Sequence, residues 1–455
     1  MKKLLATILA LVMALSLCSV SWATDTGKIV VHGIKYNDKD DSEFATFKAA
    51  YDALKPVVAS VCDTNGGADG LGQKSAKSAE AFKSVFTDVD SKGNATITYK
   101  ISGNVTYDET SCANLLTMGR KSSHYNADNQ RLHLINFKFI GEDANRGATL
   151  TVNSDITLPY EWWGENTTTA ISFENLTITG SAPNGLYPYQ KFFEGISFSV
   201  NNCTLKGIKI YNCSNVGGSY SITNSTLDGT GAPGNAYAIH LQGNETAPLT
   251  ITISGNEISG YDRGVNIDQK TAQATVSENK ISIKDAGRSC IQLTQLKTTT
   301  VSGNTMNLTG GNAITLHKAL ATQTQPAADI SIENNTITGT GYLIYDDVTA
   351  NNGTLDNTNL NLTMSGNTVA STINTKQGVK GDTVYDTSDV VAEKVSAGVT
   401  VQQPAPRYYY NSTTTDTKAD ATKGSPKTFD AGIGIYALTA VLSVTGMAWT
   451  AKKRH

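Results

Sequence analysis

The sequence is poor in charged residues, aromatic residues and proline. Charged residues make up 17% and aromatic residues 7% of its 455 positions, and there are only 10 prolines. This composition excludes a charged disordered chain and an aromatic-rich core. Glycine is abundant at 40, and Asn, Thr and Ser fill much of the remainder. Such a mixture favours many short strands joined by turns over long helices.

The sequence also lacks a basic patch and a Cys-x-x-Cys motif. Lys and Arg number 37 against 40 Asp and Glu, so nucleic acid is not an expected partner. We expect no metal and no cofactor, because the cysteines outside the N-terminal apolar stretch are irregularly spaced: Cys62, Cys112, Cys203, Cys213 and Cys290. We predict that most of them are small core residues, and a disulfide between Cys203 and Cys213 is the alternative for that pair.

Long apolar runs are confined to the two ends of the chain. Near the start, two lysines precede the apolar stretch 4–17, and Ser21 and Ala23 are small residues at the positions that a signal peptidase reads. We predict a signal peptide over 1–23, and hence an exported protein. A lipoprotein site at Cys18 is the alternative, and the bulky leucine before it argues against that site.

Near the other end, the sequence "SPKTFD" precedes a second apolar run. Residues 431–451 carry no charge, and as a helix they would measure about 31 Å, enough to cross a bilayer. A basic tail follows and would stop transfer. We therefore predict a transmembrane helix within the segment 425–455.

The segment 425–455 resembles the C-terminal sorting signal of Gram-positive cell-wall proteins. The matching motif is Ser425, Pro426, Lys427 and Thr428. The resemblance implies that a sortase-type transpeptidase cuts after Thr428 and joins it to peptidoglycan, which would place the protein in the cell wall. Phe429 stands where that family has glycine. A plain membrane tether at the cell surface is the alternative.

The middle of the chain repeats a short motif in which Asn is followed by a polar and then an apolar residue. Clear copies are "ITISGNEISG", "ATVSENKISI", "TTVSGNTMNL", "ISIENNTITG" and "LTMSGNTVAS". Their asparagines are Asn256, Asn279, Asn304, Asn335 and Asn367, at spacings of 23, 25, 31 and 32. Upstream copies carry Asn136, Asn175, Asn202 and Asn224. An Asn at one corner of every repeat can hydrogen-bond to the Asn of the next repeat, forming a ladder.

A second recurring segment with apolar residues lies between the Asn motifs, in "AIHLQ", "GVNID", "CIQLT", "AITLH" and "LIYDD". Each alternates apolar and polar residues, as half-buried strands do, so one repeat holds about three strands. The pattern is similar to the right-handed parallel β-helix of the pectate-lyase-like superfamily, and we assign 96–395 to that all-β solenoid. An array of β-sandwiches is the alternative.

The flanks of the solenoid read differently. We predict an N-terminal α/β cap over 24–95, with a strand from Gly27 and a helix that starts at Asp40, where Asp40 and Glu43 have capping-box spacing. The segment 396–424 is rich in Pro, Ser and Thr and is predicted to be a flexible stalk.

We assign no catalytic residue. "YDRGVNID" places Asp262, Arg263 and Asp268 on one repeat, which a Ca²⁺-dependent lyase would need, but a solvated turn explains them as well. Asp346 and Asp347 are adjacent, so on a strand they would point to opposite faces. His240 and His317 are single histidines at strand positions. The loop that starts at Asp88 lacks the bidentate Glu of a calcium site.

An aromatic cluster is the best candidate for ligand contact. The stretches "LPYEWWGEN" and "GLYPYQKFFEG" supply Trp162, Trp163, Tyr187 and Tyr189 as a platform for sugar rings. Simple packing of a loop against the solenoid is the alternative. We therefore expect a non-catalytic, adhesin-like surface protein that contacts glycans or a host surface. A surface polysaccharide lyase or glycoside hydrolase and a structural wall spacer are the other hypotheses.

Overall fold

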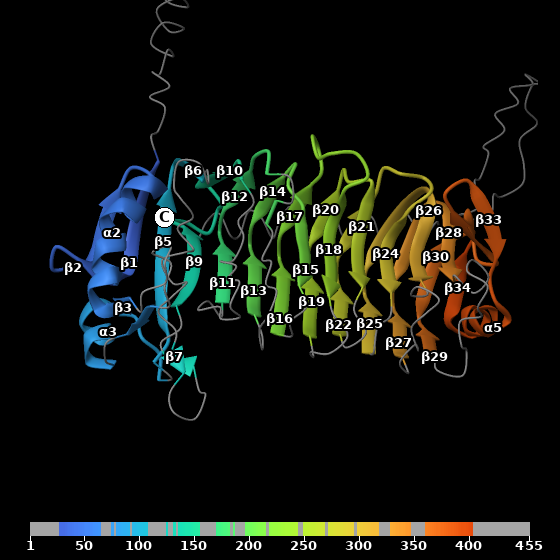
Figure 1. The fold of residues 1–455 in the computed structure, drawn as a ribbon. Helices are drawn as coiled ribbons and strands as arrows, with labels where there is room; N and C mark the ends of the chain where they lie inside the picture. The colour runs from blue at the N-terminus through green and yellow to red at the C-terminus, as the bar shows by residue number, and fades with distance from the viewer. Residues whose placement is uncertain are drawn as a thin grey trace, which may run out of the picture. The chain divides into compact units, whose positions relative to one another are not determined.

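A computed structural model describes residues 27–64, 74–76, 79–91, 93–107, 124–125, 131–132, 135–154, 170–182, 185–186, 196–214, 218–243, 249–268, 272–294, 298–317, 328–346 and 360–403. These residues lie within one unit that ends at Pro404. Within it the strands stack one coil after another, from the blue N-terminal strands to the orange C-terminal ones (Figure 1).

The first face of the solenoid is a sheet of twelve strands. From the third strand onward, each strand pairs in parallel with the equivalent strand of the next coil. Alternate residues are buried because successive side chains point to opposite sides of a strand. In spatial order the strands are β2 (Lys39–Phe44), β1 (Lys28–Tyr36), β5 (Ala95–Ser102), β9 (Ile135–Gly141), β11 (Ala170–Glu174), β13 (Ile196–Asn201), β16 (Gly218–Thr223), β19 (Leu249–Ser254), β22 (Ala272–Ser277), β25 (Thr298–Ser302), β27 (Ala328–Glu333) and β29 (Leu360–Ser365).

The second and third faces belong to one sheet of sixteen strands, because two long strands turn the corner between them. The second face holds β6 (Asn104–Tyr107), β10 (Thr149–Val152), β12 (Thr177–Thr179), β14 (Thr204–Lys206), β17 (Thr226–Asp228), β20 (Glu257–Ser259), β23 (Lys280–Ser282), β30 (Asn367–Ala370) and β34 (Val399–Gln402). The third holds β15 (Ile210–Ser214), β18 (Tyr237–Gly243), β21 (Arg263–Asp268), β24 (Ser289–Thr294) and β31 (Ile373–Asn374). The corner-turning strands are β26 (Thr305–His317) and β28 (Thr336–Asp346).

Three parallel faces per coil make this a parallel β-helix, as the repeat predicts. The antiparallel pairs that a β-sandwich array would need are confined, in the described ranges, to the N-terminal cap and to short hairpins. Those hairpins are β3 (Cys62–Thr64) with β4 (Lys74–Ala76), β7 (His124–Tyr125) with β8 (Arg131–Leu132), and β32 (Gln377–Lys380) with β33 (Thr383–Asp386).

The core consists of columns of inward side chains in register from coil to coil. At the N-terminal end the column is aromatic: the rings of Tyr99, Phe139 and Phe173 stack at centroid distances of 5.1 and 5.0 Å. Further along it becomes aliphatic, with Ile253 and Val276 fully buried. Each such side chain contributes about 1.5–3 kcal/mol by leaving water.

The predicted asparagine ladder is confirmed at one corner of the C-terminal coils. Asn256, Asn279, Asn304, Asn335 and Asn367 are at most 1% exposed. The Oδ1 atom of Asn304 accepts from the backbone N–H and the Nδ2 of Asn279, at 3.0 and 2.9 Å. Its own Nδ2 donates to Val276 O at 2.8 Å and to Asn335 Oδ1 at 2.9 Å. Every hydrogen-bonding site of this buried amide is therefore used, which is what burial requires.

Asn175, Asn202 and Asn224 lie one position before the buried ladder, so the prediction misplaces them. The expected bond between the asparagines of successive coils nevertheless forms between two of them, because Asn202 Nδ2 donates to Asn175 Oδ1 at 2.7 Å. Asn175, Asn202 and Asn224 have φ of 58°, 51° and 52°, the left-handed conformation that Asn tolerates. In the C-terminal coils this conformation falls on the residue before the ladder Asn, such as Gly303 with φ 66°. The ladder position itself is occupied by Ser225 in the coil of Asn224, and its N–H donates to Asn256 Oδ1 at 3.0 Å.

Arg146 connects the coils at this corner where the Asn ladder is missing. Its Nε and Nη2 donate to Asn202 Oδ1 at 3.0 and 2.9 Å, and its Nη2 reaches Asn224 O at 2.7 Å. Its Nη1 donates to the hydroxyls of Thr204 and Thr226, both at 3.1 Å. One guanidinium therefore ties together two coils beyond its own, which five donors in a fixed plane allow.

The N-terminal cap contains the predicted strand, β1, but its helix begins later than expected. Asp40 and Glu43 lie on β2, where Glu43 pairs with Lys28 at 3.0 Å, so they are not a capping box. The helix is α2 (Phe47–Val61), and its first turn is capped by the Thr46 hydroxyl, which accepts from the N–H of Ala49 at 3.1 Å. A short helix, α3 (Ala79–Val85), adds Phe82 to the covered end.

The C-terminal end is closed by α5 (Asp389–Gly398), followed by β34. These elements occupy positions that composition assigned to the stalk, so a stalk that starts at 396 is wrong through 402. The last ladder residue, Asn367, donates to Gly398 O at 3.3 Å, and a Cβ at Gly398 would lie 2.2 Å from Met364 O. Glycine therefore lets the end of the helix come close to the ladder, so that the Gly398 carbonyl accepts the last hydrogen bond of the ladder.

Several predictions concern residues outside the described ranges. The signal peptide 1–23, most of the stalk, the sorting segment 425–455 with its transmembrane run, and Cys112 all lie there. Among the described residues no helix is long and apolar enough to cross a bilayer. Cys203 and Cys290 are free and buried, and burial raises the pKa of each thiol to about 12, as expected of core residues.

Replacing a ladder residue tests its contribution. Asn304→Leu leaves Val276 O and the amide groups of Asn279 buried without hydrogen-bond partners, so we expect the free energy of unfolding to fall by about 2–4 kcal/mol. Urea unfolding monitored by far-UV circular dichroism measures it. Asn307→Leu, at an exposed position of β26 three residues further along the chain, is the control and should change stability by less than about 0.5 kcal/mol. Equal effects of the two substitutions would contradict the ladder.

Candidate functional site

The third face carries a row of outward polar and aromatic side chains. Parallel register aligns Tyr211, His240, Asn266, Gln292, Thr315 and Tyr345 across six successive strands. The same strands point Ile239, Val265 and Ile291 inward, where they are fully buried. The core therefore fixes the position of every side chain in the row, because a one-residue slip would bury the polar set.

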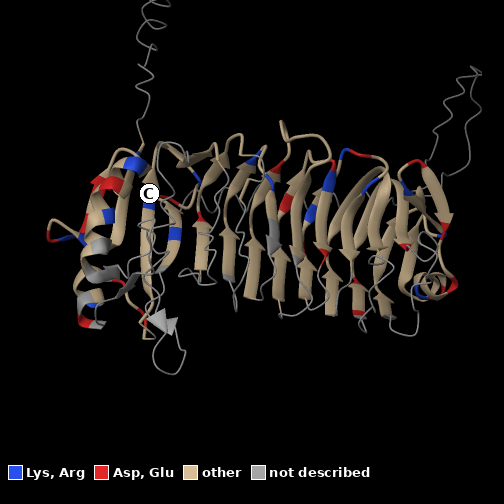
Figure 2. Ribbon diagram, viewed as in Figure 1, with Lys and Arg blue, Asp and Glu red and all other residues tan. Residues whose placement is uncertain are grey.

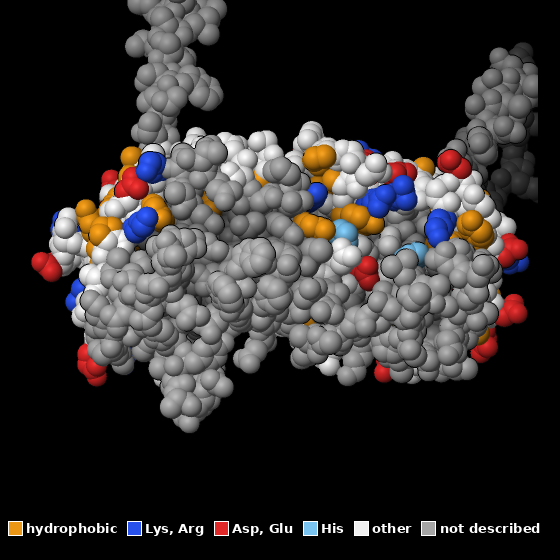
Figure 3. All heavy atoms as spheres, viewed as in Figure 1, with side chains coloured by type: hydrophobic (Ala, Val, Ile, Leu, Met, Phe, Trp, Pro, Cys, Tyr) orange, Lys and Arg blue, Asp and Glu red, His pale blue; other side chains and the backbone are white. Residues whose placement is uncertain are grey.

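A groove of about 170 Å³ runs along this row toward the C-terminal cap. The hairpin of β32 and β33 forms its wall, held by Asn312, whose Nδ2 donates to Val379 O at 2.7 Å and whose Oδ1 accepts from Val379 N at 2.9 Å. Figure 3 shows basic, histidine and apolar side chains gathered over this part of the face. The lining side chains used below are Tyr237, Arg263, Arg288, His317, Tyr345 and Lys380, and we call this feature the basic groove.

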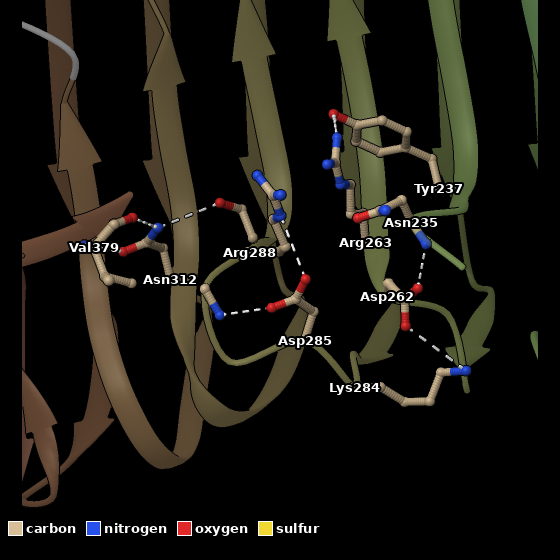
Figure 4. A network of polar contacts seen from close by, with 11 residues as sticks. Asn235, Tyr237, Asp262, Arg263, Lys284, Asp285, Arg288, Asn312 and Val379 are labelled. Carbon is tan, nitrogen blue, oxygen red and sulfur yellow. Dashed lines mark hydrogen bonds and ion pairs between the residues drawn. The ribbon is translucent and has the colours of Figure 1, made fainter. Parts of the chain in front are cut away.

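The basic groove is positively charged. Arg263, Arg288 and Lys380 line it, and no Asp or Glu is among its lining residues in the described ranges. Arg263 lies over the ring of Tyr237, with the guanidinium carbon 4.8 Å from the ring centroid, and its Nη1 donates to the Tyr237 hydroxyl at 2.8 Å. Figure 4 shows this pair beside the contact of Arg288 with Asp285, which measures 3.4 Å.

Some polar atoms around the groove are not satisfied within the described structure. Asn266 is 4% exposed, and its Oδ1 has no hydrogen-bond partner. The Nε of Arg263 and the hydroxyl of Thr294 on the neighbouring strand are buried without a partner as well. Leaving such groups unpaired costs about 1–3 kcal/mol each, so ordered water or a ligand would be stabilising at each of them, and Arg263 is the one of the three that lines the groove.

His240 is held neutral by its surroundings. Its ring lies between Tyr211 and Tyr237, at centroid distances of 5.1 and 4.7 Å. Burial lowers the pKa of His240 to about 4, and the positive charges of Lys209 and Arg263 act in the same direction. At neutral pH the imidazole therefore carries no charge and can accept a hydrogen bond, but its low pKa makes it a weak acceptor of a proton.

The acidic residues singled out in the sequence do not converge. Asp262 accepts from Asn235 N–H and lies 3.8 Å from Lys284, in a turn before β21 (Figure 4). Asp268 ends the same strand, and burial raises the pKa of its carboxyl. No group of three His, Cys, Asp or Glu in the described ranges could hold a metal ion, so the calcium arrangement of a lyase is not formed there.

Other candidate positions have structural explanations. Asp346 is 4% exposed and accepts from the N–H of Ser388 at 3.2 Å, where α5 begins, so it stabilises the cap. The carboxylate of Asp90 accepts from the backbone N–H and the Nδ2 of Asn94, at 2.8 and 3.0 Å, and so closes a turn. Asp347 and the aromatic platform of Trp162, Trp163, Tyr187 and Tyr189 lie outside the described residues, and the platform stays a prediction.

Sequence reasoning singled out Arg263 only together with Asp262 and Asp268, and it missed the other basic residues of the groove. Arg263 and Arg288 are 25 positions apart, close to the spacing of paired residues such as Val265 and Ile291, and that spacing is the signal that could have joined them. Lys380 gave no such signal, because it reaches the groove through a hairpin of the C-terminal cap.

Comparison with known proteins supports the fold. A family model described as a right handed beta helix region matches residues 206–393, from β14 into α5. Neither a curated protein nor a solved structure matches the chain. The parallel sheets and this match together identify the solenoid as a right-handed β-helix, and they leave its ligand open.

The neutral state of His240 predicts a pH dependence of stability. The pKa of His240 is lower in the folded chain than the roughly 6.5 of an unfolded chain. The contribution of His240 to the free energy of unfolding is therefore complete above about pH 6.5. It is lost as the pH falls toward 4, because the unfolded state then takes up a proton that the folded state does not. We expect His240→Gln to remove up to about 3 kcal/mol of this acid sensitivity. Urea midpoints of both proteins between pH 7 and 4 measure it, and parallel curves would contradict the assignment.

Proposed function

We propose that this protein is an exported, surface-held β-helix that binds acidic glycans without cleaving them, and that the basic groove is its binding site. The observation that carries the proposal is the presence of Arg263, Arg288 and Lys380 around one groove whose described lining holds no carboxylate. Guanidinium groups pair with carboxylates and sulfates through parallel hydrogen bonds, which makes an acidic sugar the matching ligand.

The groove also suits the neutral parts of a sugar. Half-buried Tyr237 and Gln292 line it and present a phenol hydroxyl and an amide to sugar hydroxyls, as carbohydrate sites do. Tyr345 and Thr315 are at most 5% exposed, so they shape the floor of the groove. Because these residues sit on strands fixed by the core, little conformational entropy is lost on binding.

A polysaccharide lyase is the second candidate, and neutral His240 is the observation that favours it. A lyase needs a base to remove a proton next to a uronate and positive charge to stabilise the carbanion that forms. His240 and Arg263 lie on adjacent strands and would be the base and the positive charge, with the low pKa of His240 making it a weak base at neutral pH. A hydrolase is less well supported, because Asp268 has no second carboxylate opposite it in the row and hydrolysis commonly uses two.

The proposed location rests on the two chain ends. A signal peptide over 1–23 and the Ser425 to Thr428 motif would export the chain and join it to the wall, with the solenoid held outward by the stalk. Thr428→Ala should move the protein from the wall fraction to the membrane fraction, because the transpeptidase loses its cleavage site. Fractionation of cells with lysozyme measures this. An unchanged distribution would leave a membrane tether as the anchor.

Glycan binding is tested by removing one charge from the groove. Arg288→Gln should weaken binding of an acidic polysaccharide, such as polygalacturonate or a sulfated glycan, by about tenfold, or roughly 1.4 kcal/mol. Glycan arrays and calorimetry with the 24–424 fragment measure it, with neutral dextran as the reference ligand.

Lys206→Gln removes the same charge from an exposed position of β14 and is the matched control, expected to leave binding unchanged. If the wild type releases an unsaturated uronate product that absorbs in the ultraviolet, the protein is a lyase and not a binding protein without catalytic activity. Equal, weak binding of every glycan by all three proteins would contradict the proposal and favour a wall spacer.

A further inference from the structure

A carboxylate without a partner lies just beyond the basic groove. Asp268 ends β21 and is half-buried, and it points outward because Ile267 before it is buried in the core. It forms no hydrogen bond and no ion pair within the part of the chain that the structure describes. Burial raises the pKa of its carboxyl, and the charge of His317 acts in the opposite direction. Acidic side chains taken from water are usually paired, so this one marks a position for a partner.

Parallel register connects this carboxylate to the groove. Asp268 lies opposite Thr294 on β24, and Thr294 lies opposite His317 on β26, which lines the basic groove. The row that they form lies two residues beyond the row of Asn266 and Gln292. Adjacent strands are about 4.8 Å apart, so Asp268 lies two strand spacings from the groove residue His317. A ligand that extends out of the groove along this row therefore meets the carboxylate.

Two oxygen atoms next to Asp268 are also without donors. Asn266, one outward position earlier on the same strand, is 4% exposed, and its Oδ1 has no hydrogen-bond partner. Thr294, on the neighbouring strand, is 3% exposed, and its hydroxyl has no partner either. Neither atom has to touch a ligand, because unpaired lone pairs in a poorly hydrated setting make the potential at the carboxylate more negative. The described chain therefore gathers three oxygen groups here and supplies no donor for them.

A compact cation of single charge is the partner that fits this arrangement. A divalent metal ion prefers several carboxylates, and no metal-holding group of acidic or histidine side chains forms in the described ranges. A primary ammonium group carries one charge and donates up to three hydrogen bonds, so a single carboxylate can hold it. An acetylated amine is neutral and gains nothing from that charge. The chemistry of the site therefore distinguishes a free amino group from an acetylated one.

The third face thus carries opposite charges at opposite ends of its strands. Arg263 begins β21 and Asp268 ends it, five residues or about 17 Å further along the strand. Arg288 stands just before β24, at the same end as Arg263. Figure 2 shows how few charged residues the strands between the two caps carry, so these charges have little competition from neighbours. A ligand that satisfies both ends carries an acidic group and a basic group.

We propose that Asp268 binds an amino group of the ligand, so that the glycan held by this chain carries free amino groups as well as acidic groups. The inference rests on the proposed binding of acidic glycans at the basic groove and names their class. A polymer in which uronates alternate with amino sugars offers both groups along one strand of sugar. A purely acidic polymer pairs with the arginines alone and leaves Asp268 without a partner.

Two forms of one polymer test the proposal by calorimetry with the full chain in mild detergent. N-desulfated heparin carries acidic groups and free amino groups, and its N-acetylated form keeps the acidic groups but has neutral amides. Near neutral pH the wild type should bind the free-amine form at least about fivefold more tightly. Asp268→Asn should bring this ratio to about one and leave the affinity for the N-acetylated form unchanged. The thermal midpoint should not fall, because asparagine replaces a charge without a partner, which separates lost recognition from lost folding.

The matched control is Glu257→Gln, which removes the same charge from an exposed position of β20 and should keep the wild-type preference. Arg288→Gln should weaken binding of both forms by the same factor. Equal binding of the two forms by the wild type, tighter than that of neutral dextran, would overturn the amino-group contact and leave the basic groove standing. So would an Asp268→Asn variant that keeps the preference. If neither form binds more tightly than dextran, the proposed function fails and this inference fails with it.

Discussion

The hydrogen bonds of the buried asparagine ladder are the interaction on which this structure depends. A β-helix turns a corner three times per coil, and at one corner the turning backbone leaves peptide groups that no sheet can pair. From Asn256 to Asn367 the side-chain amides bond those groups and one another in a continuous chain. Because each amide is fully satisfied inside the core, a coil cannot shift against its neighbour without stranding several polar atoms at once.

This constraint explains how the outer faces come to present ordered rows of side chains. With the coils held in register, side chains from residues far apart in the sequence form straight rows, and the repeat length decides which residues become neighbours. On the third face this brings Arg263 and Arg288 to one groove, and on the first it aligns Ser221 with Thr252 and Thr275. In the described N-terminal coils the buried ladder gives way to a bond from Asn202 to Asn175, and Arg146 bridges the same corner from outside.

The ladder could be predicted from the sequence because one residue type recurs at one structural position. Asn304 and its equivalents carry the same surroundings in every copy, so periodicity alone located them. The same rule misplaced Asn202, since Asn serves equally well in the left-handed turn next to the ladder. The start of α2 was missed for a similar reason: Asp40 and Glu43 have helix-cap spacing, but tertiary pairing with β1 holds them in a strand. Lys380 could not be placed at all, because no local pattern encodes the fold-back of a terminal hairpin.

The account rests on the ladder being the most stable seam of the solenoid, and hydrogen exchange measures that most directly. The backbone N–H groups of Asn256, Asn279 and Asn304 each donate to the next side-chain oxygen at 3.0 Å. If the ladder holds the coils together, these protons exchange only when the whole unit unfolds, with the protection of the core strands. Exchange as fast as in the exposed turn between β32 and β33 would show that the corner opens locally, and would contradict the account.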